Sequence, residues 1–301
     1  MFAIVLLYDA DSNVPRDEHS SLHGSFGAAG LIHPHIYMLV NGYPGGSRVI
    51  QSANLDIETM RCWIKLLGQL VVKVYSDDPD HKPANNHNMC LVLQTPRPTP
   101  TLYYISGHVL PSDGQRVYVP SDGLSGSDLI PGRGITYLQM RNLLMTPHSS
   151  GALVDRFRSV PFDVLIVTVM KMCRCENILE LPYVWWYEDG QVKCEKTKHH
   201  GKFKGDSVPM VHFAATGPEA EAVWFPSWGA VFTKAFHKID PSKGLSLKAI
   251  VKWIQLKMDL VVDDWNSGRR DGDQRLLPQR HMVYTSRKFG NEDFFKTLGF
   301  L

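Results

Sequence analysis

The sequence has no long hydrophobic run. The longest apolar stretch near its start, residues 2–7, is too short for a signal peptide or a membrane span, and no basic segment precedes it. No other run reaches membrane-spanning length. We therefore expect no membrane partner.

The sequence also lacks an excess of charge of either sign. It has 32 Lys and Arg against 30 Asp and Glu, a net charge of +2, so nothing demands a polyanionic partner such as nucleic acid. Its five cysteines are an odd number without the spacing of a disulfide framework. We expect reduced thiols in a cytoplasmic or nuclear compartment, each free to do chemistry.

Two kinds of binding motif are missing as well. Residues 9–18, which follow the first apolar segment, contain no glycine-rich phosphate loop, and this disfavours a flavodoxin-like domain that binds a small ligand. Cys173 and Cys175 form a C-x-C pair, but their spacing is too short for a tetrahedral zinc site. The other cysteines are too scattered to complete one. We expect no metal and no cofactor.

What the sequence does contain is enough apolar material for a sizeable core, 44% of its residues with seven Trp. Strands are predicted at residues 3–7, 101–105, 116–119, 164–170, 210–215 and, as a further possibility, 281–285. Helices are predicted at 57–71, capped by Asn54, and at 136–144, 230–238 and 246–261, whereas 77–88 is polar and expected to be exposed. Strands that alternate with helices predict a mostly parallel, doubly wound sheet.

Two of these strands end in reactive side chains. The strand at 101–105 leads into Ser106-Gly107-His108, and the strand at 164–170 leads into Cys173. If the strands are neighbours, His108 and Cys173 project from one edge of the sheet, as a thiol nucleophile and its imidazole base require. The alternative is a buried small hydrophobic cysteine and an incidental histidine.

The order of the surrounding motifs favours the first interpretation. The segments are LHGSFGAA (22–29), TLYYISGH (101–108), DGQRVYVPSD (113–122), KMCRC (171–175) and a stretch at 211–236. The first is similar to the pattern L-x-G-x-x-x-D-A, with Ala28 at the position where the acid usually stands. In this order they resemble the caspase-like cysteine peptidases, which include caspases, metacaspases and their fungal relatives.

The resemblance implies a three-layer caspase-like α/β fold with a mostly parallel six-stranded sheet. Residues 1–187 would be the large portion of one domain, 188–207 a flexible linker loop, and 208–301 the small portion. The partners would be protein or peptide substrates in proteolysis or programmed cell death. Whether the chain is a monomer or a homodimer stays open.

The resemblance also assigns roles at the site. Cys173 would attack the peptide carbonyl, and His108 would protonate the leaving amine. The backbone N–H groups of Cys173 and Val109 would stabilise the oxyanion.

The chain departs from the family pattern at two positions, where Val109 and Glu176 replace glycines. A β-branched side chain resists positive φ, so the donor at Val109 would be displaced. The alternative to a cysteine endopeptidase is therefore a degenerate pseudopeptidase that binds partners or serves as a scaffold.

Charged residues near the nucleophile predict the substrate. Lys171 stands where metacaspases carry an Asp that selects Arg or Lys, and Arg174 matches the caspase pattern. Cations favour a carboxylate, so cleavage after Asp or Glu is predicted. Arg16 is a second candidate ligand for this carboxylate, and the resemblance adds Ala215 to the substrate-binding residues.

The linker at 188–207 is also a candidate for autocleavage. Its composition indicates an accessible segment. Asp189 and Asp206 would be the cleaved residues under acidic specificity, and Lys residues in the same segment would be cleaved under metacaspase-like specificity. An ordinary flexible loop is the alternative.

Overall fold

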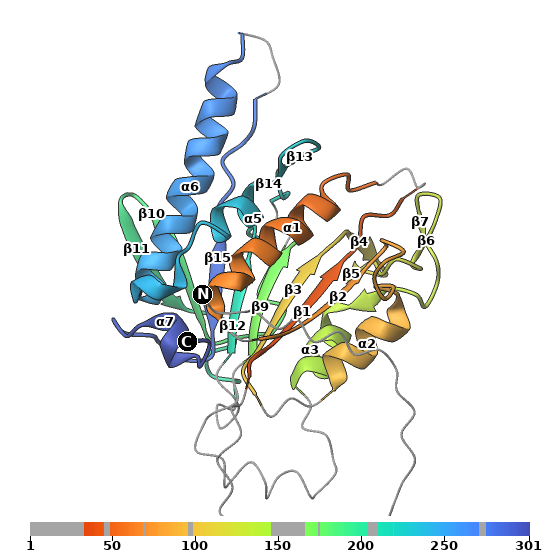
Figure 1. Cartoon of the computed structure of the whole chain (residues 1–301), viewed down its shortest axis with the longest axis horizontal. Helices are drawn as coiled ribbons and strands as arrows, with labels where there is room; N and C mark the ends of the chain where they lie inside the picture. The colour runs from red at the N-terminus through yellow and green to blue at the C-terminus, as the bar shows by residue number, and fades with distance from the viewer. Residues whose placement is uncertain are drawn as a thin grey trace, which may run out of the picture.

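The computed structural model of the chain describes residues 33–44, 49–68, 70–95, 99–145, 166–173, 175–203, 210–218, 220–270 and 275–301. They build a mixed α/β structure around one large sheet (Figure 1). In spatial order its strands are β11 (Gln191–Lys196), β10 (Tyr183–Glu188), β15 (Met282–Thr285), β12 (Met210–Ala214), β9 (Ile166–Lys171), β3 (Thr101–Ser106), β1 (His35–Val40) and β2 (Val71–Ser76). The five from β2 to β12 are parallel, and the other three continue the sheet antiparallel.

The predicted number of six strands is wrong, because the sheet has eight. Four of the eight, β1, β2, β10 and β11, are not among the predicted strands. The strands β10 and β11 form a hairpin that occupies part of the segment interpreted as a flexible linker. Asp189 and Gly190 form its two-residue turn, both with positive φ (51° and 78°), as a tight hairpin turn requires. An Asp-Gly pair between two strands is typical of a hairpin. The hairpin was not predicted because the second strand is rich in Lys and does not have an apolar pattern.

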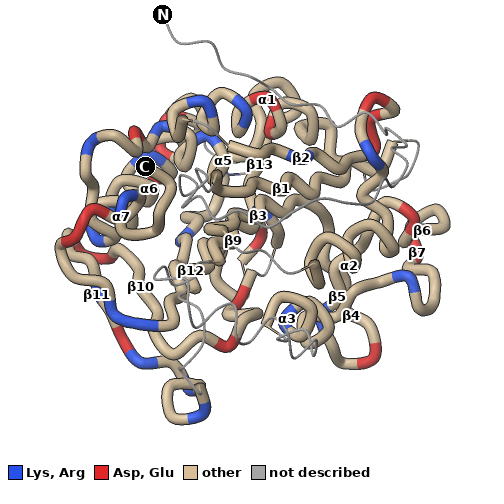
Figure 2. Tube along the Cα trace, turned by 60° about the horizontal axis from the view of Figure 1, so that its bottom comes forward, with Lys and Arg blue, Asp and Glu red and all other residues tan. Residues whose placement is uncertain are grey.

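Helices cover both faces of the sheet, so the structure has three layers (Figure 1). On one face lie α1 (Ala53–Ile64), α5 (Val231–Phe236) and α6 (Leu247–Ser267), and on the other lie α2 (Asn86–Gln94) and α3 (Tyr137–Met145). Neighbouring residues of β1 contribute to different layers: Met38 and Val40 pack toward α1, and Tyr37 and Leu39 toward α2. Cations and anions are interspersed around the outside (Figure 2).

Most predicted elements are confirmed, with shifted ends. The central strands β3 and β9, the strands β12 and β15 and the helices α3, α5 and α6 all form, and residues 115–118 form the short strand β5 (Gln115–Tyr118). The helix α3 begins at a capping box in which Thr136 and Gln139 each accept the other's backbone N–H, at 3.1 and 2.8 Å. The helix α6 continues six residues beyond the predicted end, to Ser267.

Three predictions in the first third of the chain need correction or fall outside the description. The helix predicted to reach residue 71 ends at Ile64 and gives way to a 3-10 turn and then β2. Its N-cap position is Ser52 rather than Asn54, and the Ser52 side chain makes no capping hydrogen bond. The polar segment 77–88 holds the start of α2, capped by Asn85. The predicted strand at 3–7 and the motif at 22–29 lie outside the described residues, and the first described strand is β1.

Candidate functional site

The candidate site lies where β3 and β9 end. The two strands are neighbours and parallel, with Ser106 opposite Lys171. His108 and Cys173 each follow two residues after this pair. Neighbouring strands run about 4.8 Å apart, so the chain brings both residues to one edge of the sheet, as predicted.

Gly107 makes room for the turn that carries His108. A Cβ atom on this residue would lie 2.7 Å from the hydroxyl of Tyr118 and 2.8 Å from that of Tyr43. Both distances are shorter than carbon–oxygen contacts allow. The glycine before the histidine is therefore required by the close approach of two tyrosines.

The side chain of Tyr43 lies against His108. Their rings stack with centroids 4.9 Å apart and planes 22° from parallel, and the Tyr43 hydroxyl accepts the backbone N–H of His108 at 2.9 Å. The same hydroxyl donates to the carbonyl of Val119. The backbone N–H of Val119 in turn donates to the carbonyl of His108. Burial raises the pKa of Tyr43, so the phenol stays neutral.

Cys173 is half-buried, and its Sγ accepts the backbone N–H of Ala222 at 3.4 Å. Its side chain is thus partly open to solvent and touched by a backbone N–H from the loop after β12. Cys175 differs: it is fully buried, its thiol lies 3.4 Å from the carbonyl of Met170, and burial raises its pKa to about 12. Of these two thiols, Cys173 is the accessible one and Cys175 is enclosed.

The predicted oxyanion donor Val109 begins the short strand β4 (Val109–Ser112), where it pairs with Tyr118 of β5. It is not among the residues with positive φ. Val109 thus does not adopt the positive φ that a glycine allows, as expected of a β-branched side chain. Glu176 is held by an ion pair with Arg116 of β5 at 3.3 Å.

Lys171 is not available to a substrate as predicted. Its side chain is 3% exposed and pairs at 3.4 Å with the fully buried Asp56 of α1. The other oxygen of Asp56 accepts the backbone N–H of Ala230 at 3.0 Å. Burial raises the pKa of Asp56, and the Lys171 ammonium acts in the opposite direction by favouring the carboxylate.

Asp56 is a residue that sequence reasoning missed. Nothing in the sequence indicates that this carboxylate has a buried partner. Tyr43 was missed for the same reason, because its contact with His108 joins segments 65 residues apart.

Ala215 does not offer its backbone N–H to a substrate. It is fully buried directly after β12, donates to the carbonyl of Met170 at 3.0 Å, and accepts from the side chain of Gln279 at 2.9 Å. The residue of this loop that faces the thiol is Ala222.

The remaining predicted residues divide into two groups. Arg16, Arg174 and Asp206 lie outside the described residues. Asp189 is exposed but sits in the tight turn between β10 and β11. Because proteases bind extended segments, this turn is a poor cleavage site unless the hairpin opens.

Two buried histidines lie behind the site. His212 of β12 bonds Thr168 at 2.8 Å and the carbonyl of Glu176 at 3.2 Å, and burial lowers its pKa to about 4. His281 lies 3.0 Å from the Gln255 side-chain oxygen, and burial lowers its pKa to about 3. Both rings are neutral near pH 7.

Comparison of the sequence with models of known families and with curated proteins finds no match in either case. None of the described helices is both long and apolar enough to cross a membrane. Within the described ranges, no group of three or more His, Cys, Asp or Glu side chains is placed to hold a metal ion.

Proposed function

We propose that the protein is a cysteine endopeptidase in which Cys173 is the nucleophile and His108 the acid–base partner. The observation that carries the proposal is the register of β3 and β9, with Ser106 opposite Lys171, which sets the two reactive residues equally far past the ends of adjacent strands. The order of strands from β2 to β15 and the sequence motifs together support a caspase-like fold as part of the same proposal.

The reaction proceeds in two steps. His108 takes the proton of the Cys173 thiol, the sulfur bonds to the carbonyl carbon of the peptide, the C–N bond breaks, and His108 passes that proton to the leaving amine. Water then attacks the thioester, His108 takes its proton, and the Cys173 thiol is restored as the acid product leaves. The backbone N–H groups of Cys173 and Val109 are the proposed donors to the oxyanion.

A preference for Asp or Glu at P1 stays part of the proposal. Its support is now Arg174 and Arg16, because the charge of Lys171 is matched by Asp56. Fluorogenic peptides that differ only at P1, with Asn and Gln as neutral controls, test the preference. Cleavage confined to Arg or Lys peptides contradicts it.

The second candidate is a pseudopeptidase that binds partners through the same groove. The observation that favours it is the Lys171–Asp56 pair. Because Lys171 is buried against Asp56, it is not available to bind a substrate carboxylate, which was its predicted role. Every atom of the dyad is present under both functions, so only reactivity separates them.

Covalent labelling with a peptidyl fluoromethyl ketone is the direct experiment. We expect one adduct by intact mass, lost in Cys173→Ala and kept in Cys175→Ala, since the second thiol is buried. Turnover of a peptide library with the same dependence on Cys173 identifies an endopeptidase. Folded protein that binds the peptides but neither reacts nor cleaves is a pseudopeptidase.

A further inference from the structure

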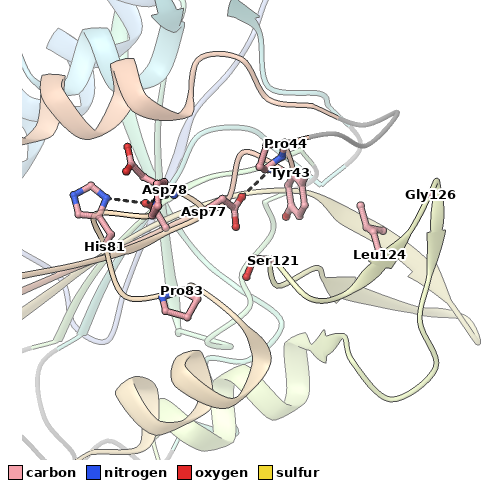
Figure 3. Close-up of a pocket in the computed structure, with 11 residues that line it drawn as sticks. Tyr43, Pro44, Asp77, Asp78, His81, Pro83, Ser121, Leu124 and Gly126 are labelled. Atoms are coloured by element: carbon pink, nitrogen blue, oxygen red, sulfur yellow. Dashed lines mark hydrogen bonds between the residues drawn. The ribbon is translucent and has the colours of Figure 1, made fainter.

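An open pocket of about 630 Å³ (Figure 3) shares Tyr43 with the surroundings of His108. It is lined by segments that follow β1 and β2 and by the segment after β5, including Tyr43, Asp77, Asp78, His81, Ser121 and Leu124. Tyr43, whose ring stacks on His108, is a wall of this pocket. The pocket and the dyad are therefore separated by one aromatic ring.

The order of the strands fixes on which side of the dyad the pocket lies. Along the sheet edge come β12, β9 with Cys173, β3 with His108, then β1 and β2. The acyl part of a substrate stays on Cys173, whereas the amine leaves toward the proton donor His108. The chain beyond the scissile bond therefore runs toward β1 and β2, where the pocket opens.

Strand spacing gives the number of substrate residues needed to reach it. From β9 to β1 and β2 is two to three spacings of about 4.8 Å, or roughly 10–14 Å, and an extended peptide advances about 3.3 Å per residue. About the third or fourth residue after the scissile bond reaches the pocket.

The charge of the lining is negative. Oδ2 of Asp77 accepts the backbone N–H groups of Gly42 and Tyr43 at 2.6 and 2.8 Å, and Oδ1 has no hydrogen-bond partner within the described part of the chain. Asp78 uses Oδ1 to accept the N–H of Asp80 at 3.0 Å. Among the described lining residues there is no Lys or Arg.

His81 does not offset these carboxylates. An Arg61 N–H lies 2.9 Å from Nε2 of His81, and because Arg only donates, Nε2 is the acceptor. The proton then sits on Nδ1, which donates to the Ser76 hydroxyl at 2.8 Å. Both ring nitrogens of His81 are thus occupied, by Arg61 and Ser76, and neither makes a hydrogen bond to Asp77 or Asp78.

We infer that this pocket binds a Lys or Arg side chain of the substrate about three or four residues beyond the cleaved bond. The inference rests on the proposed peptidase function and adds a second specificity site to it. A basic side chain fits because two carboxylates with unused oxygens line this open pocket. The described lining residues include no Lys or Arg that would repel such a side chain.

The test uses quenched fluorescent peptides that share every residue except the third and fourth after the scissile bond, which are Lys, Ala or Glu. We expect kcat/KM for the Lys peptide to exceed that for the Ala peptide about 5-fold at low salt, with the Glu peptide slowest. The ratio of Lys to Ala should fall toward 1 at about 0.5 M salt, because exposed charges are screened.

The variant Asp78→Asn keeps an acceptor for the Asp80 N–H and removes one charge. It should reduce the Lys-to-Ala ratio by about half or more, while Asp80→Asn, an equal charge change on an exposed residue outside the pocket lining, should leave the ratio unchanged. Equal rates for Lys and Ala peptides, or a ratio insensitive to Asp78→Asn, overturn the inference and leave the peptidase in place. Absence of cleavage of every peptide overturns both.

Discussion

Tyr43 holds His108 at two points, stacking on its ring at 4.9 Å and accepting its backbone N–H at 2.9 Å. The hydroxyl that makes the second contact also bonds Val119, so it ties together three segments of chain. The candidate acid–base residue is thereby fixed by a neighbour that takes no part in the bond-making steps. Tyr43 is a positioning residue.

Tyr43→Phe keeps the stacked ring and removes the hydroxyl. We expect kcat/KM on the best peptide to fall about 10-fold, with most of the loss in kcat, because the imidazole is less well oriented. The pH–rate profile should change on the limb that reports the imidazole, which a loss of stability alone does not do. Tyr187→Phe on β10 is the matched control, and an equal effect there would contradict the assignment.

Gly107→Ala should disturb the same region by crowding. A Cβ atom at 2.7 and 2.8 Å from two tyrosine hydroxyls forces one of them to move, at a cost of roughly 1–3 kcal/mol. We expect a lower midpoint of urea unfolding and loss of activity. Gly201→Ala is the control, since nothing lies within 4 Å of its Cβ position and its φ is not positive. Similar midpoints for the two variants would refute this account of Gly107.

The buried Lys171–Asp56 pair predicts strong coupling between its members. Lys171→Met leaves a buried carboxylate without its cation, and Asp56→Asn leaves a buried ammonium, so each should cost about 3–5 kcal/mol in urea unfolding. The double variant should cost less than the sum, because neither charge remains. Glu58→Gln, which breaks the exposed pair with Arg61, should change stability by about 0.5 kcal/mol or less. Additive single effects would show that the two side chains do not interact.

The two buried histidines should make the folded protein less stable as the pH falls. Each has a pKa lowered by burial, His212 to about 4 and His281 to about 3, against a value of about 6.5 in the unfolded chain. The unfolded state therefore binds more protons below about pH 6.5, and stability is complete above that pH and lost as the pH falls. The slope reaches about 1.4 kcal/mol per pH unit for each histidine, ending near pH 4 for His212 and near pH 3 for His281.

Urea unfolding at several pH values between 7 and 4 measures this slope. His212→Gln should reduce the slope of the unfolding free energy against pH by the contribution of one histidine. His87→Gln, at an exposed residue, should leave the slope unchanged. An unchanged slope in His212→Gln would mean that this ring is already protonated, or not buried, in the folded protein.

Sequence reasoning predicted the centre of the sheet well and its margins poorly. The strands β3 and β9 are buried on both faces, so their continuous apolar sequences identify them, and the relation of His108 to Cys173 follows from their ends. The strand β1 is not among the predicted strands, and Pro34 stands directly before it. The strand β11 is on the edge, where Lys residues replace the apolar pattern.

The residues around the dyad were harder to predict because they come from distant loops. Tyr43 and Asp56 both come after β1 in the chain, yet Asp56 contacts the last residue of β9 and Tyr43 contacts a residue that follows β3. No local pattern identifies such pairs. The pocket with Asp77 and Asp78 likewise exists only once the ends of β1, β2 and β5 are assembled.

The hairpin at the margin of the sheet limits how two copies of the chain could associate. The strand β15 is bonded to β12 on one side and to β10 on the other, so it has no open side for a second molecule. Sheet-to-sheet joining through β15 would first require the hairpin to detach. The open edge is β11 instead, and the Lys residues at 193 and 196 are charges of the kind that discourage edge-to-edge pairing.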